Sequence, residues 1–502
     1  MALTGIKKFK LNFLIGILGH VVTLILGLII PRFFILEFGS EVNGYIKGLD
    51  QIFVYVALLE AGVGAASLQA LYHPMGAGDK EKANSIIAAT NFYYRRTGLI
   101  FVSIIVALAF IYPLILDTEL NYWVMVALFL ILGVGGSVPY FFNSKYALVL
   151  SADGKEYVNT IFTTITQILL SVGRIVVILA GANVIVVQSV FLLINLTKAL
   201  ITWLYIKKKY KWINLRVTPD KKALSQKNSV MIHQISTLVF NNTDTLLLTF
   251  FCDLKTASIY TLYKGFIGMI STVVSMLFNA MKFKFGQTFE DKKRFVPMHD
   301  FSEILNISIT FSTCTVALMF LKPFMRLYTE GMDTNYIIAF VPLLFVVVEI
   351  LTYARIPTMS VINYAGHFKQ TKWRSVWESV INLTVSLILI KPFGICGVLL
   401  GTTAALLYRV NDVILYVNRR ILKRSPWITY KTWIVNLLIS AASYGLFCLI
   451  PLKWDNYFVI ILMAGIICFV LAPAQIALSF LAHGKKGIAL IKNAKQSVLR
   501  KK

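Results

Sequence analysis

Apolar runs of membrane-spanning length recur along the whole chain, and they limit the possible folds more than any other feature. A helix of about 20 apolar residues crosses a hydrocarbon core of about 30 Å. Only 14% of the 502 residues are charged and the mean hydropathy is +0.73, whereas soluble domains carry about 25% charged residues. We therefore expect an all-α polytopic membrane protein with about 14 transmembrane helices. The predicted spans are 11–36, 45–72, 86–116, 122–150, 158–180, 184–206, 229–251, 257–281, 301–321, 336–361, 376–390, 396–418, 432–451 and 457–482.

The basic residues are distributed unevenly between alternate loops. With the N-terminus placed in the cytoplasm, the inner segments hold 34 lysines and arginines and the outer segments hold 5. This asymmetry predicts that both termini are cytoplasmic. The net charge of +26 is then a topology signal whose natural partners are anionic membrane lipids, and we expect no nucleic-acid partner.

Short matches between the two halves indicate an internal repeat. The segment "ALAFIYPL" at 107–114 returns as "ALMFLKPF" at 317–324, and Gly154 corresponds to Gly366. A repeat unit of six spans enters the membrane in the same direction twice, which predicts two parallel lobes around a central cleft, as in transporters. The predicted parts are an N-terminal lobe (1–206), a basic cytoplasmic linker (207–228), a C-terminal lobe (229–418), an extra helix pair (419–482) and a basic amphipathic tail (483–502).

A carboxylate, Glu60, lies among small apolar residues inside the second span. An ionisable group at this depth needs a partner. The turn at 73–84 places Arg95 and Arg96 at a similar depth on the next helix. We expect Glu60 to form a structural ion pair with one of these arginines. The alternatives are a protonation switch and a simple helix-packing position.

Basic residues outnumber acidic residues inside the predicted spans. This excess favours an anionic cargo, for which a pyrophosphate group is suitable. Arg409 and Asp412 are spaced to pair on one helix, and Lys145 lies near the inner end of its span. The predicted substrate-binding residues are Lys47, Arg95, Arg96, Arg174, Lys198, Lys264 and Arg355, of which Lys47 has Asp50 as an alternative partner.

Two segments carry a resemblance to a known group of transporters. They are "EAGVGAASLQALYHPMGAGDKEKANSI" (60–87) and "HQISTLVFNNTDTLLLTFF" (233–251). Together with the pattern of two sixes plus two spans, they resemble the multidrug/oligosaccharidyl-lipid/polysaccharide exporter superfamily, in its branch of Gram-positive polysaccharide-biosynthesis, sugar translocase-like flippases. The resemblance implies a flippase in the bacterial cytoplasmic membrane that moves a polyprenyl-pyrophosphate-linked oligosaccharide by alternating access. It further implies a cleft lined by the first two helices of each lobe, the second of which carries Lys47 or Lys264, and we expect a monomer.

Some relatives in this superfamily hold a sodium ion, which implies a coupling site here for Na⁺ or H⁺. The matching oxygen-bearing residues are Asp244, Glu378, Asn382 and Thr402. In the alternative interpretation Asp244 caps polar neighbours, and Glu378 lies at the cytoplasmic interface beside Lys372 and Arg374.

Motifs for catalysis, metal binding or cofactor binding do not occur in the sequence. The five cysteines are scattered, and the glycine clusters lie inside spans. We therefore expect neither an enzyme nor a cofactor. A membrane glycosyltransferase or polymerase remains an alternative, but the longest outer loop (322–335) has only fourteen residues. The sequence is also compatible with a lipid II-type flippase, or with a multidrug or cation antiporter of the same fold.

Overall fold

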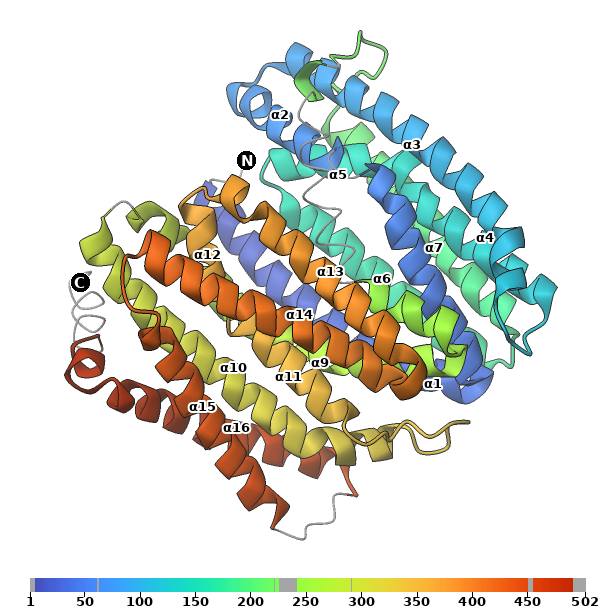
Figure 1. Cartoon of the computed structure of the whole chain (residues 1–502). Helices are drawn as coiled ribbons and strands as arrows, with labels where there is room; N and C mark the ends of the chain where they lie inside the picture. Colours follow the sequence, from blue (N-terminus) through green and yellow to red (C-terminus); the bar gives the residue numbers. More distant parts are fainter. Residues whose placement is uncertain are drawn as a thin grey trace. The chain divides into compact units, whose positions relative to one another are not determined.

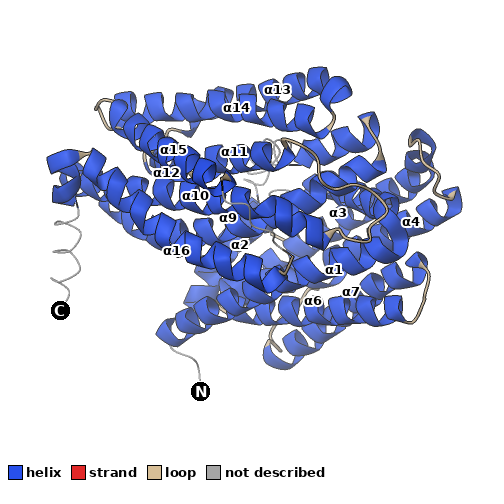
Figure 2. Ribbon diagram, turned by 90° about the horizontal axis from the view of Figure 1, so that it is seen from below, coloured by secondary structure: helices blue, strands red, loops and turns tan. Residues whose placement is uncertain are grey.

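Helices make up almost all of the structure. A computed structural model describes residues 5–60, 63–220, 222–224, 242–289, 291–449 and 455–490, and within these ranges it contains no strand (Figure 2). The predicted all-α fold class is confirmed. Long helices suit these apolar segments because a helix pairs its own backbone N–H and C=O groups, which the membrane interior cannot do.

The chain divides into two compact units, residues 1–258 and 259–502. In the first unit, α1 is continuous through a kink at Gly39, which has a φ of 82° and separates the first two predicted spans. The elements of the first unit are α1 (Gly5–Val56), η1 (Ala57–Glu60), α2 (Val63–Ala77), α3 (Lys80–Ile115), α4 (Tyr122–Val138), η2 (Pro139–Asn143), α5 (Ser144–Ala152), α6 (Glu156–Leu179), α7 (Val184–Lys209) and η3 (Lys222–Leu224).

The second unit begins within α9 and ends after α16. Within it, α13 and α14 lie side by side along their lengths, and α15 and α16 pack on α10 (Figure 1). Its elements are α9 (Leu254–Thr288), α10 (Lys292–Tyr328), α11 (Val341–Tyr353), α12 (Ile356–Tyr364), α13 (Phe368–Phe393), α14 (Ile395–Tyr416), η4 (Val417–Ile421), α15 (Trp427–Cys448) and α16 (Tyr457–Ala482).

Asparagine or aspartate begins six of these helices. At each start the side-chain oxygen accepts a hydrogen bond from a backbone N–H two or three residues later, which satisfies a donor that the helix itself cannot pair. The capping residues are Asp79, Asn121, Asn183, Asp253, Asp291 and Asn456, for α3, α4, α7, α9, α10 and α16.

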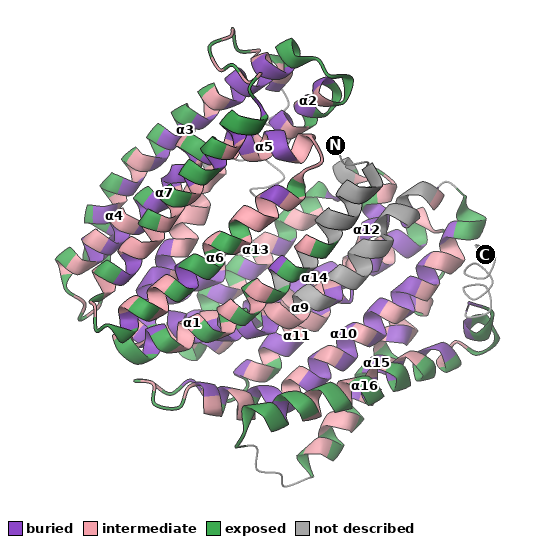
Figure 3. Ribbon diagram, turned by 180° about the vertical axis from the view of Figure 1, so that it is seen from behind, coloured by how far each residue is buried: buried purple, intermediate pink, exposed green. Residues whose placement is uncertain are grey.

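Ten of the described helical segments are long and apolar enough to cross a membrane. The first two predicted spans share α1, and part of the seventh, residues 229–241, lies outside the described residues. α10 is buried along most of its length, whereas α16 exposes apolar side chains along most of its length (Figure 3). An exposed apolar surface on a spanning helix is what a lipid environment favours.

Two features recur at equivalent positions of the predicted internal repeat: a glycine with positive φ and a break in the span before it. Gly154 and Gly366 both adopt a positive φ, 68° and 66°, and each ends a helix after the fourth span of its repeat. The same two spans are interrupted: α4 passes into α5 through a π-turn at 139–143, and α11 passes into α12 through a break at Ala354 and Arg355.

The basic linker is folded against the first unit. The Asn84 side chain donates to the carbonyl oxygen of Trp212 over 3.0 Å and accepts from the backbone of Asn214 over 2.9 Å. Ile213 and Leu215 pack against a buried cluster at the ends of α2, α3, α5 and α7. The division into units falls after residue 258 because helical residues 242–251 also pack on the first unit, for example Phe250 on Tyr112.

Candidate functional site

The second predicted span is broken beside Glu60. α1 ends at Val56, a single 3₁₀ turn covers 57–60, and α2 begins at Val63. Broken spanning helices expose backbone polar groups and commonly form transporter binding sites. The Glu60 carboxylate and the hydroxyl of Tyr94 on α3 both lie beside Gly64, so the two groups face each other. Gly64 permits this approach, since a Cβ there would lie 3.1 Å from the Tyr94 hydroxyl.

The predicted ion pair of Glu60 with Arg95 or Arg96 is therefore wrong in its partner. The expected depth in the membrane identified the correct helical turn of α3, the one that contains residues 94–96. Consecutive residues on a helix, however, point about 100° apart. Tyr94 is the residue that faces the carboxylate. Arg95 and Arg96 are exposed and make no ion pair among the described residues.

Next to Tyr94, α3 contributes to a cluster of basic groups. The Lys145 ammonium on α5 donates to Asn91 over 2.8 Å and to the carbonyl oxygen of Phe141 over 2.9 Å. Arg95 follows Asn91 by four residues on α3, so the two side chains lie on one face of this helix. Lys145 is only 7% exposed. Although it lies near the inner end of its predicted span, its side chain is buried in the protein. The π-turn at 139–143 directs the Phe141 carbonyl to this ammonium, and π-turns are frequent at functional sites.

The other basic residues predicted for the substrate in the first unit contact mainly neutral groups. Arg174 donates to the Gln188 side chain over 2.7 Å, and Lys198 donates to Thr163 over 3.2 Å. Lys47 differs, because its ammonium lies 3.2 Å from the Asp50 carboxylate. That pair is the alternative that the sequence offered for Lys47.

In the second unit, by contrast, the basic residues form a buried ion-pair network. Arg355 lies 2.8 Å from Glu378 of α13, and Arg409 of α14 lies 3.4 Å from the same carboxylate. Arg409 is 3.0 Å from Asp412, which Arg374 also contacts. The predicted Arg409–Asp412 pair is confirmed. Arg355 has an acidic partner that the sequence analysis did not find, which removes the argument for it as an unpaired substrate residue.

This network also occupies one residue of the predicted coupling site. Glu378 pairs with two arginine side chains. Its carboxylate is therefore already neutralised by the protein's own positive charges, which would compete with a coupling cation. Asn382 donates to Thr402 over 3.0 Å. Asp244 is buried in the first unit, beside Thr243, whose hydroxyl is 2.7 Å from that of Tyr55. Lys264, in the second unit, lies over the Tyr260 ring at 5.6 Å.

A second buried cluster joins α10 to the C-terminal helix pair. Asp300 contacts Arg424 and lies 2.8 Å from Lys486, and Glu303 accepts hydrogen bonds from Thr358 and Thr429. The ligand atoms of His299, Asp300 and Glu303 lie within 4.8 Å of one another. A metal ion there would compete with the Arg424 guanidinium and the Lys486 ammonium for both carboxylates, which makes this cluster a structural ion-pair site.

Several of these residues were not singled out from the sequence. Asn91, Tyr94, Gln188, Asp300 and Arg424 are polar partners whose types carry no motif. Pro139 was a usable signal, since a proline inside a span marks a break. The arrangement in the first unit can bind an anion: a guanidinium and an ammonium share one side of α3 and α5, with an amide beside them, and such groups grip phosphate oxygens.

Known proteins resemble this chain in structure and not in sequence. No family model matches the chain, and no curated protein sequence matches it. Solved structures do match. The lipid II flippase MurJ in an inward closed conformation has a TM-score of 0.65 at 16% identity, covering 91% of this chain and 98% of MurJ.

Two multidrug transporters of the MATE family match as well. An inward-facing MATE transporter of the MOP superfamily has a TM-score of 0.64 at 16% identity, covering 80% of this chain and 95% of its own. A MATE transporter of Vibrio cholerae has a TM-score of 0.56 at 14% identity, covering 84% and 98%. The chain therefore has the fold of the multidrug/oligosaccharidyl-lipid/polysaccharide (MOP) exporter superfamily, as the resemblance predicted.

Proposed function

We propose that this protein is a flippase that moves a polyprenyl-pyrophosphate-linked oligosaccharide across the bacterial cytoplasmic membrane by alternating access. The observation that carries the proposal is the buried Lys145 ammonium, whose hydrogen-bond partners, the Asn91 amide and the Phe141 carbonyl, are neutral, together with Arg95 one helical turn after Asn91 on α3. Two like charges inside a spanning region raise each other's free energy unless an anion joins them. A pyrophosphate group provides that anion and leaves the protein when the cargo does.

The fold comparison is consistent with this cargo. MurJ is named as a flippase for lipid II, a lipid-linked glycan. The proposal for the present chain is the same chemical class, a phosphate-bearing lipid with a sugar headgroup. A transport role also suits the short predicted outer loops, which offer little surface for catalytic groups. Carrier-lipid profiling after gene deletion identifies the glycan, because the cargo of an absent flippase accumulates in the inner leaflet.

The direct experiment measures flipping in proteoliposomes. The cargo is a fluorescent polyprenyl-pyrophosphate disaccharide, and the readout is the fraction accessible to an external enzyme over time. The double variant Arg95→Gln/Lys145→Gln should flip at least about tenfold more slowly, since each charge-assisted hydrogen bond to phosphate contributes about 1.5–3 kcal/mol. Arg95→Lys should be intermediate, because an ammonium cannot bind phosphate bidentately.

The matched control is Lys82→Gln, which removes one exposed positive charge from the first turn of the same helix. It should flip at the wild-type rate. Thermal unfolding in detergent checks that the double variant folds. A folded double variant with wild-type flipping would show that these cations do not bind the cargo.

One observation favours a second candidate, a multidrug antiporter. Glu60 is a carboxylate at a break in a spanning helix, which can bind either a proton or a cationic drug, and MATE transporters share the fold. This candidate requires that expression of the protein protects cells against lipophilic cations and that Glu60→Gln abolishes the protection. The flippase proposal expects no protection in either case.

A further inference from the structure

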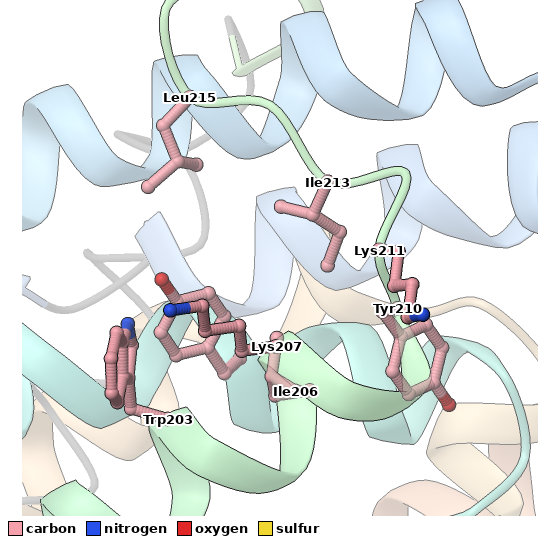
Figure 4. Close-up of a pocket in the computed structure, with 8 residues that line it drawn as sticks. Trp203, Ile206, Lys207, Tyr210, Lys211, Ile213 and Leu215 are labelled. Carbon is pink, nitrogen blue, oxygen red and sulfur yellow. The ribbon is translucent and has the colours of Figure 1, made fainter.

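A pocket lies in the first unit where α7 ends and the basic linker begins. It encloses about 490 Å³, within the range of about 300–1,000 Å³ that small-molecule sites occupy. Figure 4 shows Ile213 and Leu215 of the linker above Trp203, Ile206 and Lys207 of α7. The lining residues are Tyr146, Trp203, Ile206, Lys207, Tyr210, Lys211, Ile213 and Leu215.

The walls of this pocket are held in place by specific contacts. The Tyr210 hydroxyl donates to Asp153 over 2.7 Å and accepts from Lys155 over 3.0 Å. These bonds raise the pKa of Lys155 above its ordinary value, despite the opposing effect of its partial burial, because a negative charge lies 2.6 Å away. Asn84 anchors the linker through Trp212, as described above. The pocket is therefore a formed site and not a gap under a loose segment.

The positive charges at the pocket have no acidic partner among the described residues. The Lys207 ammonium lies 4.9 Å from the centre of the Trp203 ring, and Lys211, which follows the end of α7, is exposed and also lines the pocket. The Asp153 carboxylate, which the Tyr210 hydroxyl of this pocket contacts, is paired with Lys155. The pocket therefore presents two ammonium groups to a ligand, at the position where α7 leaves its candidate span.

A second cavity begins at the same tryptophan and continues along α7. It encloses about 300 Å³ and is lined only by Phe142, Leu196, Ala199, Leu200 and Trp203. The α7 residues are spaced by three or four positions, so they lie on one face of the helix. This face is open to the membrane: Leu200 is 55% exposed and Trp203 is 42% exposed.

We propose that the two cavities form one site for an anionic phospholipid of the surrounding membrane. The phosphate headgroup binds Lys207 and Lys211, and one acyl chain lies in the apolar groove, with Trp203 at the junction. Tryptophan commonly occupies this polar–apolar boundary of a bilayer, and basic residues there attract anionic lipids. The proposal does not depend on the cargo, because it concerns a lipid that stays bound to the outer surface of α7.

The test measures lipid binding to the purified full-length protein in detergent by native mass spectrometry. The probes are phosphatidylglycerol and phosphatidylcholine of identical acyl chains. Phosphatidylglycerol should bind at least about tenfold more tightly, and Lys207→Gln/Lys211→Gln should remove most of that preference, since each basic residue near a membrane surface contributes about 1 kcal/mol. Leu200→Trp, which fills the groove and keeps both lysines, should weaken binding of both lipids.

The matched control is Lys208→Gln/Lys209→Gln, which makes the same charge change in the last turn of α7 but leaves the lining untouched. It should keep the preference within about twofold. Equal losses in the two double variants would mean diffuse attraction to a basic surface and would overturn the proposal. A third probe, polyprenyl phosphate, distinguishes the source: displacement of phosphatidylglycerol at equimolar concentration would assign the site to the carrier lipid instead.

Discussion

The two units place charged residues inside the predicted membrane spans in different ways. In the second unit, Arg355 and Arg409 meet Glu378, so each buried charge has a counter-charge within the protein. In the first unit, Lys145, Arg174 and Lys198 meet amide, carbonyl or hydroxyl oxygens. A charge that is neutralised internally holds helices together, whereas a charge that is only solvated by neutral groups can still bind an anion. The counter-charge of a buried basic residue therefore distinguishes the two units more clearly than its depth in the membrane does.

The largest expected loss of stability follows from breaking the ion-pair network of the second unit. Arg409, which is 2% exposed, should be the most sensitive position. Arg409→Gln leaves Glu378 and Asp412 each with one partner fewer, and we expect a loss of about 3 kcal/mol in the free energy of unfolding. Unfolding in detergent, followed by tryptophan fluorescence, measures it. Lys145→Gln is the comparison in the first unit. If both substitutions cost the same, the two units do not differ as described.

A smaller effect sharpens the assignment of Glu60. Tyr94→Phe removes the hydroxyl that faces this half-buried carboxylate, which should cost about 1–3 kcal/mol. Arg95→Gln changes an exposed residue and should cost less than about 0.5 kcal/mol. The same unfolding assay ranks the two variants. The reverse ranking would restore the ion pair that the sequence predicted.

The smallest effect concerns Lys47, the first-unit cation of the predicted substrate set that has a carboxylate partner. The Lys47 and Asp50 side chains are 38% and 47% exposed, and exposed ion pairs contribute about 0–1 kcal/mol. Lys47→Gln should therefore change the stability by less than about 1 kcal/mol and the flipping rate by less than about twofold. A tenfold slower rate at unchanged stability would return Lys47 to the residues that contact the cargo.

The sequence predicted the fold class and most span positions because hydropathy alone determines which segments are stable in a bilayer. It also predicted the equivalence of Gly154 and Gly366, whose left-handed conformations require a residue without a Cβ. These features depend on local composition, which a single sequence contains.

The partners of the buried charges were harder to predict. Arg355 and Glu378 lie at similar distances before and after the turn at Gly366, so the depth argument used for Glu60 would have paired them. Depth does not give the direction in which a side chain points, however. The breaks at 57–60 and at Arg355 rotate the following helix by an amount that hydropathy does not reveal.

The cluster of Asp300, Glu303, Arg424 and Lys486 has a consequence for how such a chain could be shortened. The last two helices lie outside the internal repeat, and by sequence alone they look like a removable addition. Two acidic side chains of α10, however, contact basic side chains that follow α14 and α16. A chain ending before Arg424 would lose the guanidinium and the ammonium that neutralise both buried carboxylates, and among the described residues only His299 would remain as a basic neighbour of Asp300. Buried ion pairs therefore tie the segments that flank this helix pair to α10, so the pair is part of the folded second unit.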